Sequence, residues 1–152
     1  MQPPLDYHLL ELARLEGTDD GLVVRVKHNR QKRVLKVILR CGDSRMGYYD
    51  LELTYLQVEI LPDDNATLAR IARSTIEANR HGCDLACHEV DSVDDGRIEH
   101  RFIFHTSPWV RTGDERFWLF TVKCQELQWH KLPRKSQALT PMADRYHGGP
   151  GS

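Results

Sequence analysis

Histidine and cysteine, two common metal-binding residues, gather in one short segment, HGCDLACHE. Its side chains His81, Cys83, Cys87 and His88 are ligand types that zinc takes in proteins. In an extended segment the Cα atoms of Cys83 and Cys87 are roughly 13 Å apart, at about 3.3 Å per residue. Because a zinc-bound thiolate lies about 2.3 Å from the metal, this spacing argues against zinc. We expect free thiols here and no metal site.

Histidines in the C-terminal half are candidates for proton transfer: His88, His100, His105 and His130. A histidine pair on a sheet can act as general acid and base, as in ribonuclease-like cleavage. Because residues two apart share a strand face, His100 lies on the same face as Phe102. A tight turn between the two strands would bring His88 close to His100. A histidine on an apolar strand face is more often a hydrogen-bonded core residue. We therefore assign no catalytic residue.

Acidic residues are concentrated between positions 84 and 99. Paired carboxylates can bind a divalent cation or act as acid and base. Their spacing fits no calcium-binding loop, and two of them stand in a DDG turn. We interpret the segment as an acidic rim that faces a partner, and we expect no metal and no cofactor. The acidic residues are Asp84, Glu89, Asp91, Asp94, Asp95 and Glu99.

The densest charge cluster is RVKHNRQKRVLKVILR, sixteen residues with seven Lys or Arg and no acid. Apolar and polar residues alternate in it, which predicts two strands joined by a polar turn. If Val24, Val26, Leu35 and Val37 face the core, the cations of both strands face solvent on a common side. Such a surface can bind an acidic protein or a nucleic-acid backbone. The predicted partner-binding residues are Arg25, Lys27, Arg30, Lys32, Arg33, Lys36 and Arg40.

Three interpretations of this basic hairpin stay open: a protein-binding site, a nucleic-acid site, and a solvated surface that is neutralised internally. Asp50 and Glu52 are expected on the same outward face of the next strand, where they can pair with Lys36 and Arg40. No aromatic residue stands among the cations, so the segment lacks a stacking platform for bases. Protein binding is therefore the main hypothesis and nucleic-acid binding the alternative.

Composition narrows the class of protein. A net charge of −1 over 152 residues argues against a general polyanion binder. No apolar run reaches the roughly 18 residues of a membrane span, and the first residues, MQPPLDYH, do not resemble a secretory signal. We therefore expect a cytoplasmic protein with free cysteines. Common catalytic motifs such as GxSxG, HExxH, CxxC and the phosphate-binding loop are missing from the sequence.

One helix is predicted to begin near Pro62, with Asp63, Asp64 or Asn65 as its cap, and to end near residue 81. Arg73 and Glu77 would form an ion pair on it. Before the helix the faces taken by apolar and polar residues exchange at 54–55, which predicts a β-bulge or a sharp bend there. The apolar residues from 9 to 15 fit both the helical and the strand period. The GTDDG turn after them favours a strand that forms a hairpin with the next segment. The predicted strands are 9–15, 22–27, 35–41, 49–60, 85–93, 97–105 and 117–132.

These patterns predict one α+β domain over residues 1–133 and a flexible C-terminal tail over 134–152. Four strands, one helix and three strands would form a curved antiparallel sheet of about seven strands packed on the helix. We expect a non-catalytic binding module, of an immunity or accessory type, that binds another protein through hairpins of opposite charge. The alternative is an RNA- or DNA-binding protein with histidine-based nuclease activity. The charge segregation also fits head-to-tail self-association.

Overall fold

The computed structural model describes residues 6–15, 17–43, 45, 47–78, 83–93, 95–106 and 116–133. The predicted tail over 134–152 lies outside the described residues. None of the described helices is long and apolar enough to cross a membrane. The elements are α1 (Tyr7–Ala13), β1 (Leu22–Asn29), β2 (Val34–Asp43), β3 (Gly47–Leu56), α2 (Pro62–Arg73), β4 (Cys83–Ser92), β5 (Ile98–Thr106), β6 (Phe117–Cys124) and β7 (Glu126–Pro133).

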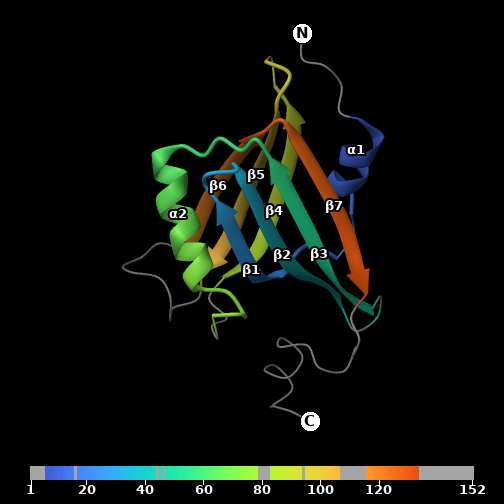
Figure 1. Ribbon diagram of the computed structural model, residues 1–152. Helices are drawn as coiled ribbons and strands as arrows, with labels where there is room; N and C mark the ends of the chain where they lie inside the picture. Colours follow the sequence, from blue (N-terminus) through green and yellow to red (C-terminus); the bar gives the residue numbers. More distant parts are fainter. Residues whose placement is uncertain are drawn as a thin grey trace.

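The seven strands form one antiparallel sheet in the order β6-β5-β4-β1-β2-β3-β7 (Figure 1). The junction between β1 and β4 is narrow, because within the described residues its register consists of the single pair Leu22–Asp84. Beyond it the free edge of β1 accepts hydrogen bonds from the segment after α2, from Ile76 N to Val23 O (2.9 Å) and from Glu77 N to Val24 O (3.0 Å). The sheet therefore has two halves: β4, β5 and β6, and β1, β2, β3 and β7.

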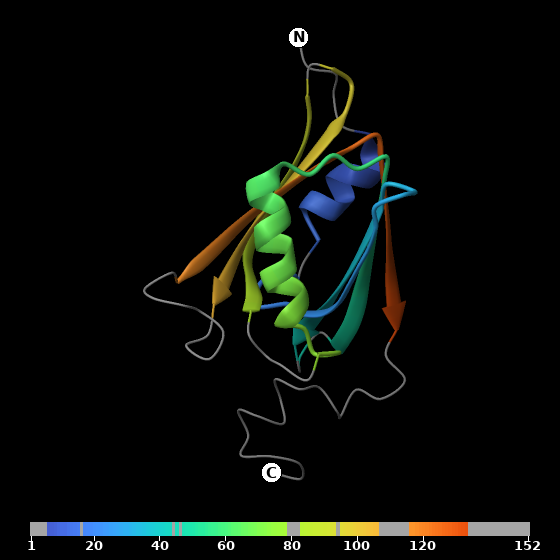
Figure 2. The ribbon, with the colours of Figure 1, turned by 60° about the vertical axis from the view of Figure 1, so that its left-hand side comes forward.

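Each helix contacts both halves of the sheet. Helix α2 lies against β6 and β1, and its Asp64 accepts a hydrogen bond from Thr121 N of β6 (3.1 Å). Helix α1 contacts β4, while the ring of His8 stacks on Trp129 of β7 at 4.8 Å. Figure 2 shows the two helices one behind the other between the halves. The helices bury apolar side chains there and link the halves where the sheet itself is narrow: Leu9, Leu12, Leu68 and Ile71.

The two outer strands of the sheet meet at one end. Strands β6 and β7 stand at opposite ends of the strand order, yet Gln125 alone separates them in the chain. Gln125 N donates to Leu56 O (3.0 Å), and Glu59 forms an isolated bridge with Lys123 of β6. This arrangement brings buried side chains of β3 and β5 together in one core.

The predicted total of about seven strands is correct, but it includes two wrong predictions that offset each other. The segment 9–15 does not form a strand: residues 7–13 are helix α1, whose first turn is capped by Asp6 accepting from Leu9 N at 2.9 Å. The single strand predicted at 117–132 is two strands, since the chain changes from one sheet edge to the other at Gln125. The predicted order of four strands, a helix and three strands is therefore wrong, and the described residues form two helices rather than one.

Helix α2 is shorter than its apolar stripe predicted. It ends at Arg73, and the chain then turns to reach the free edge of β1. Glu77 consequently pairs with Arg25 of β1 and not with Arg73. Leu61 is the N-cap residue and makes no side-chain cap bond, so the predicted acidic or amide cap is also wrong. Pro62 at the first helical position explains the start, because proline fits there without losing a hydrogen bond.

The β-bulge or bend predicted at 54–55 does not form there, since the register of β3 with β2 is regular up to Leu56. Tyr55 stays in phase with Leu53 and is fully buried, so the strand remains regular to its end. The phase change occurs at Gln57, which has a positive φ of 55°. Irregular register occurs instead in β1, between Val23 and Arg25, and in β4, between Leu85 and Cys87.

Candidate functional site

The register of β1 and β2 sets the direction of the basic side chains. Lys27 lies opposite Lys36, and Arg25 lies opposite Ile38. On β2 these positions alternate with buried Leu35, Val37, Leu39 and Cys41. The predicted inward position of Val24 is wrong, because the irregular register places Val23 in the core instead, at 1% exposure. Because residues two apart share a strand face, Arg25, Lys27, Lys36 and Arg40 lie on the outward face.

Three of the basic residues are neutralised within the protein. Arg40 donates from Nε and Nη2 to the two carboxylate oxygens of Asp50, at 3.0 and 3.3 Å. The ammonium of Lys36 lies 3.7 Å from the carboxylate of Glu52. The predicted pairing of these cations with the next strand is thus confirmed. Arg25 pairs with Glu77 after α2.

The other four basic residues form a cationic tip at the end of the β1–β2 hairpin: Lys27, Arg30, Lys32 and Arg33. All four are exposed, and none forms an ion pair with an acidic residue in the described part of the chain. His28 lies among them, and its pKa is lowered by partial burial and then by the charge of Arg30. At neutral pH this lowered pKa favours the uncharged imidazole.

The backbone of the cationic tip is held in place. Lys32 N donates to the side chain of Asn29 (3.0 Å), which closes the turn. Val58 N donates to Arg33 O at 3.0 Å, and Arg33 Nε donates back to Val58 O at 3.3 Å. Figure 2 shows the turn in light blue, projecting sideways from the strands. A positioned turn loses less conformational entropy on binding than a mobile one.

Carboxylates outnumber cations on the outward face of β4 and β5. Arg101 pairs with Glu89 (2.8 Å), Glu99 (3.0 Å) and Asp91. These bonds, the one to Glu89 first, raise the pKa of Arg101. One guanidinium shared by three carboxylates leaves this group with an excess of negative charge. Asp94 of the predicted acidic rim lies outside the described residues.

A chain of hydrogen bonds joins two histidines to a buried tyrosine. Tyr55 Oη lies 2.8 Å from His100 Nδ1, and His100 Nε2 lies 2.9 Å from His88 Nδ1. Tyr55 and His100 are fully buried. The predicted proximity of the two histidines is confirmed, although His88 lies opposite Phe102 in the register. Burial lowers the pKa of both histidines, that of His100 strongly.

The direction of these bonds follows from burial. The Tyr55 hydroxyl has no other hydrogen-bond partner among the described residues, so it donates to His100 Nδ1. His100 then carries its proton on Nε2 and donates it to His88 Nδ1. His88 is left with a proton on Nε2 and lines an open cavity of about 460 Å³, together with Asp19 and Cys87. This set orients His88, but within the described part of the chain His88 makes no hydrogen bond besides the one to His100.

The remaining candidates do not form one site. Cys83 is buried and Cys87 exposed, and His81, the first residue of the segment in which we considered zinc and expected free thiols, lies outside the described residues. Burial raises the pKa of the Cys83 thiol to about 12, which makes it a poor nucleophile. His105 lies on the outward face beside Asp84, and His130 is exposed on β7.

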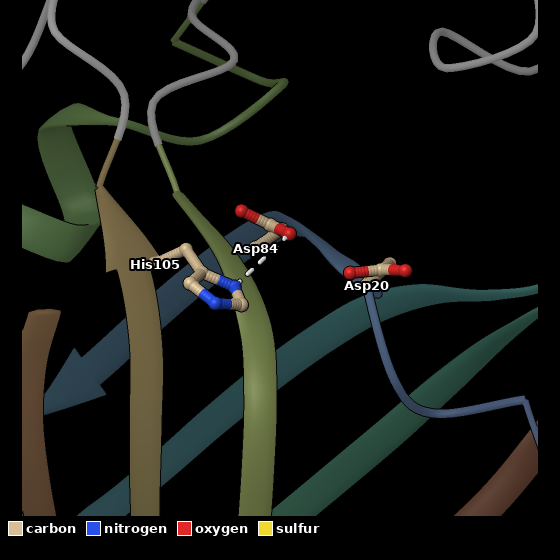
Figure 3. A group of neighbouring side chains, drawn as sticks. All are labelled: Asp20, Asp84 and His105. Carbon is tan, nitrogen blue, oxygen red and sulfur yellow. Dashed lines mark ion pairs between the residues drawn. The ribbon is translucent and has the colours of Figure 1, made fainter. Parts of the chain in front are cut away.

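One group of possible metal ligands was not found from the sequence. Asp20, Asp84 and His105 bring their ligand atoms within 4.8 Å of one another (Figure 3). Asp20 belongs to the GTDDG segment, which we interpreted as a hairpin turn. Comparison of the chain with protein-family models, with characterised proteins and with solved structures finds no match.

Proposed function

We propose that this protein is a non-catalytic binding module that docks on an acidic surface of another protein through the cationic tip of its β1–β2 hairpin. The observation that carries the proposal is the division among the seven basic residues. Arg25, Lys36 and Arg40 are paired internally, whereas the four at the tip have no acidic partner among the described residues. Unpaired charges on a fixed turn are available to an oppositely charged partner and steer its approach.

The acidic group around Arg101 provides a second charged surface, opposite in sign to the cationic tip. It lies on β4 and β5, in the other half of the sheet from the β1–β2 hairpin. A partner with one acidic and one basic patch would meet both, and a reversed orientation would bring like charges together. Such an arrangement fixes orientation more than it adds affinity.

A protein partner fits the tip better than a nucleic acid. No aromatic side chain stands between Arg25 and Arg40, and single-stranded nucleic acids usually stack their bases on such side chains. On the neighbouring outward face Lys36 and Arg40 are already paired with Glu52 and Asp50, so fewer cations are left to bind a phosphate backbone running along the hairpin. Nucleic-acid binding is therefore kept as an outcome of the test.

Affinity capture from the native host tests the class of partner. The full chain serves as bait in extracts that are treated or not treated with nuclease, and captured proteins are identified by mass spectrometry. We expect a stoichiometric protein partner that survives nuclease treatment. A triple variant, Lys27→Glu, Arg30→Glu and Lys32→Glu, should lose it. Arg33 is left unchanged because it anchors the turn at Val58.

The control bait carries Lys36→Gln and Glu52→Gln together, which removes a paired cation and leaves the net charge unchanged. It should capture the partner as well as the wild-type protein does. Partners that disappear with nuclease would instead support nucleic-acid binding. Equal capture by the triple variant would remove the cationic tip from the proposed function.

A further inference from the structure

Asp84 and His105 form a cross-strand pair at the end of β4 and β5 that lies near β1. They are direct neighbours in the register, and His105 Nδ1 lies 3.5 Å from Asp84 Oδ2. Asp20, from the segment between α1 and β1, completes a group of three ligand atoms that all lie within 4.8 Å of one another. Figure 3 shows the three side chains in a row, with Asp84 between His105 and Asp20.

The backbone holds all three residues in place. Asp20 N donates to Leu85 O (2.7 Å), and Leu85 N donates to Gly21 O (2.8 Å). The Asp20 segment is therefore bound to β4 through both backbone groups of Leu85. The imidazole of His105 packs against the ring of Phe117, with ring centroids 5.2 Å apart. A metal site needs ligands that are held in this way, because a mobile set loses entropy on binding.

The geometry of the group fits a small tetrahedral ion. Ligand atoms about 2.1 Å from a tetrahedral zinc lie about 3.4 Å apart, which is close to the 3.5 Å between His105 Nδ1 and Asp84 Oδ2. The ligand oxygen of Asp20 lies within 4.8 Å of the other two ligand atoms, and its side chain is exposed. Solvent can supply the fourth ligand because His105 is exposed as well.

The charges in the group also favour a cation. The ligand oxygens of Asp20 and Asp84 lie within 4.8 Å of each other. Two carboxylates this close repel each other unless a proton or a cation lies between them. A bound divalent ion would remove that repulsion while keeping both ionised.

We propose that Asp20, Asp84 and His105 form a binding site for a divalent first-row transition metal ion of the zinc type. The donor set of two carboxylate oxygens and one imidazole nitrogen selects this class. Magnesium and calcium take oxygen ligands almost exclusively, so the imidazole argues against them. The site is independent of the cationic tip, and either proposal can fail without the other.

Calorimetric titration of chelator-treated protein with zinc chloride near neutral pH tests the site. We expect one saturable binding event per chain. His105→Ala and Asp84→Asn should each weaken the apparent affinity at least about tenfold, since even residues that only support a ligand typically contribute about 10- to 100-fold. His130→Ala removes an exposed histidine on β7 and should leave the affinity unchanged.

Nuclear magnetic resonance of the imidazole nitrogens supplies a second readout. Zinc should shift the His105 Nδ1 signal and leave those of His130 in place. Circular dichroism of every variant checks that the fold is retained. Titration without saturation, or equal weakening by His105→Ala and His130→Ala, would overturn the proposal. So would zinc-induced shifts confined to other histidines.

Discussion

The hydroxyl of Tyr55 lies 2.8 Å from Nδ1 of His100, and this bond joins β3 to β5 through the core. The two strands belong to different halves of the sheet, separated in the strand order by β4, β1 and β2. Both residues are fully buried, so the bond satisfies polar groups that water cannot reach. Together with the helices and the shared core, it holds the two halves of the sheet against each other.

Replacing Tyr55 with phenylalanine tests this connection. The change keeps the ring but leaves His100 Nδ1 buried without its partner, which should lower the free energy of unfolding by about 1–3 kcal/mol. Urea unfolding followed by tryptophan fluorescence measures the loss. Tyr7→Phe is the matched control, because Tyr7 is 77% exposed and should change little. A Tyr55→Phe variant as stable as wild type would show that the bond contributes nothing.

Acidification should destabilise the protein through His100 and His88. Burial lowers the pKa of both in the folded state from the ordinary 6.5. The unfolded chain therefore binds these protons at higher pH than the folded chain does, and protonation favours unfolding. The contribution is fully present above the unfolded pKa and is lost as pH falls below it, by up to about 1.4 kcal/mol per pH unit for each histidine.

Urea midpoints between about pH 7.5 and about pH 5 measure this slope. The double variant Tyr55→Phe, His100→Leu should show a shallower dependence than wild type. His130→Ala should keep the wild-type slope, since His130 is exposed. Identical slopes in wild type and the double variant would contradict the assignment to His100.

The N-cap of α1 gives a prediction about the helix that the sequence pattern did not reveal. Asp6 accepts a hydrogen bond from Leu9 N at 2.9 Å, so Asp6→Ala should cost about 1 kcal/mol of stability. Glu11→Ala, on the exposed side of the same helix, is the control. Thermal unfolding by circular dichroism distinguishes them. If both variants unfold at the same temperature as the wild type, the Asp6 cap does not stabilise α1.

Arg101 should contribute to the free energy of unfolding mainly at low ionic strength. Arg101→Gln leaves Glu89, Asp91 and Glu99 without their shared cation. The pairs are largely exposed, so we expect a loss of about 0.5–1 kcal/mol in dilute buffer. The loss should shrink in about 1 M salt, where screening acts over about 3 Å. Denaturant unfolding at both salt concentrations checks this, and a loss that does not depend on salt would mean that packing rather than charge is involved.

The strands and their inward faces were largely predictable, because alternation survives in β2 and β3 up to Leu56. The helix at 7–13 was not, since Leu9 and Leu12 have helical spacing while Leu10 and Leu12 have strand spacing, and the deciding feature is the Asp6 cap. The long C-terminal segment was predicted as one strand, because the change of sheet edge at Gln125 depends on pairing with distant strands.

The charged surface was partly predictable for the same reason. Pairing of Lys36 and Arg40 with Glu52 and Asp50 followed from neighbouring strands. Arg25 was not expected to pair, because its partner Glu77 reaches it only where α2 ends early. The Asp20, Asp84 and His105 group combines three separate segments, so only the register of β4 with β5 and the position of the loop before β1 reveal it.

Direct binding of the captured partner to purified variants tests the proposed docking most closely. Calorimetry at one ionic strength compares three proteins: the wild type, the triple variant with glutamate at positions 27, 30 and 32, and the control with glutamine at positions 36 and 52. We expect the triple variant to bind at least about tenfold more weakly, a loss of about 1.4 kcal/mol, and the control to match wild type. Equal affinity of all three proteins for the partner would contradict docking through the cationic tip.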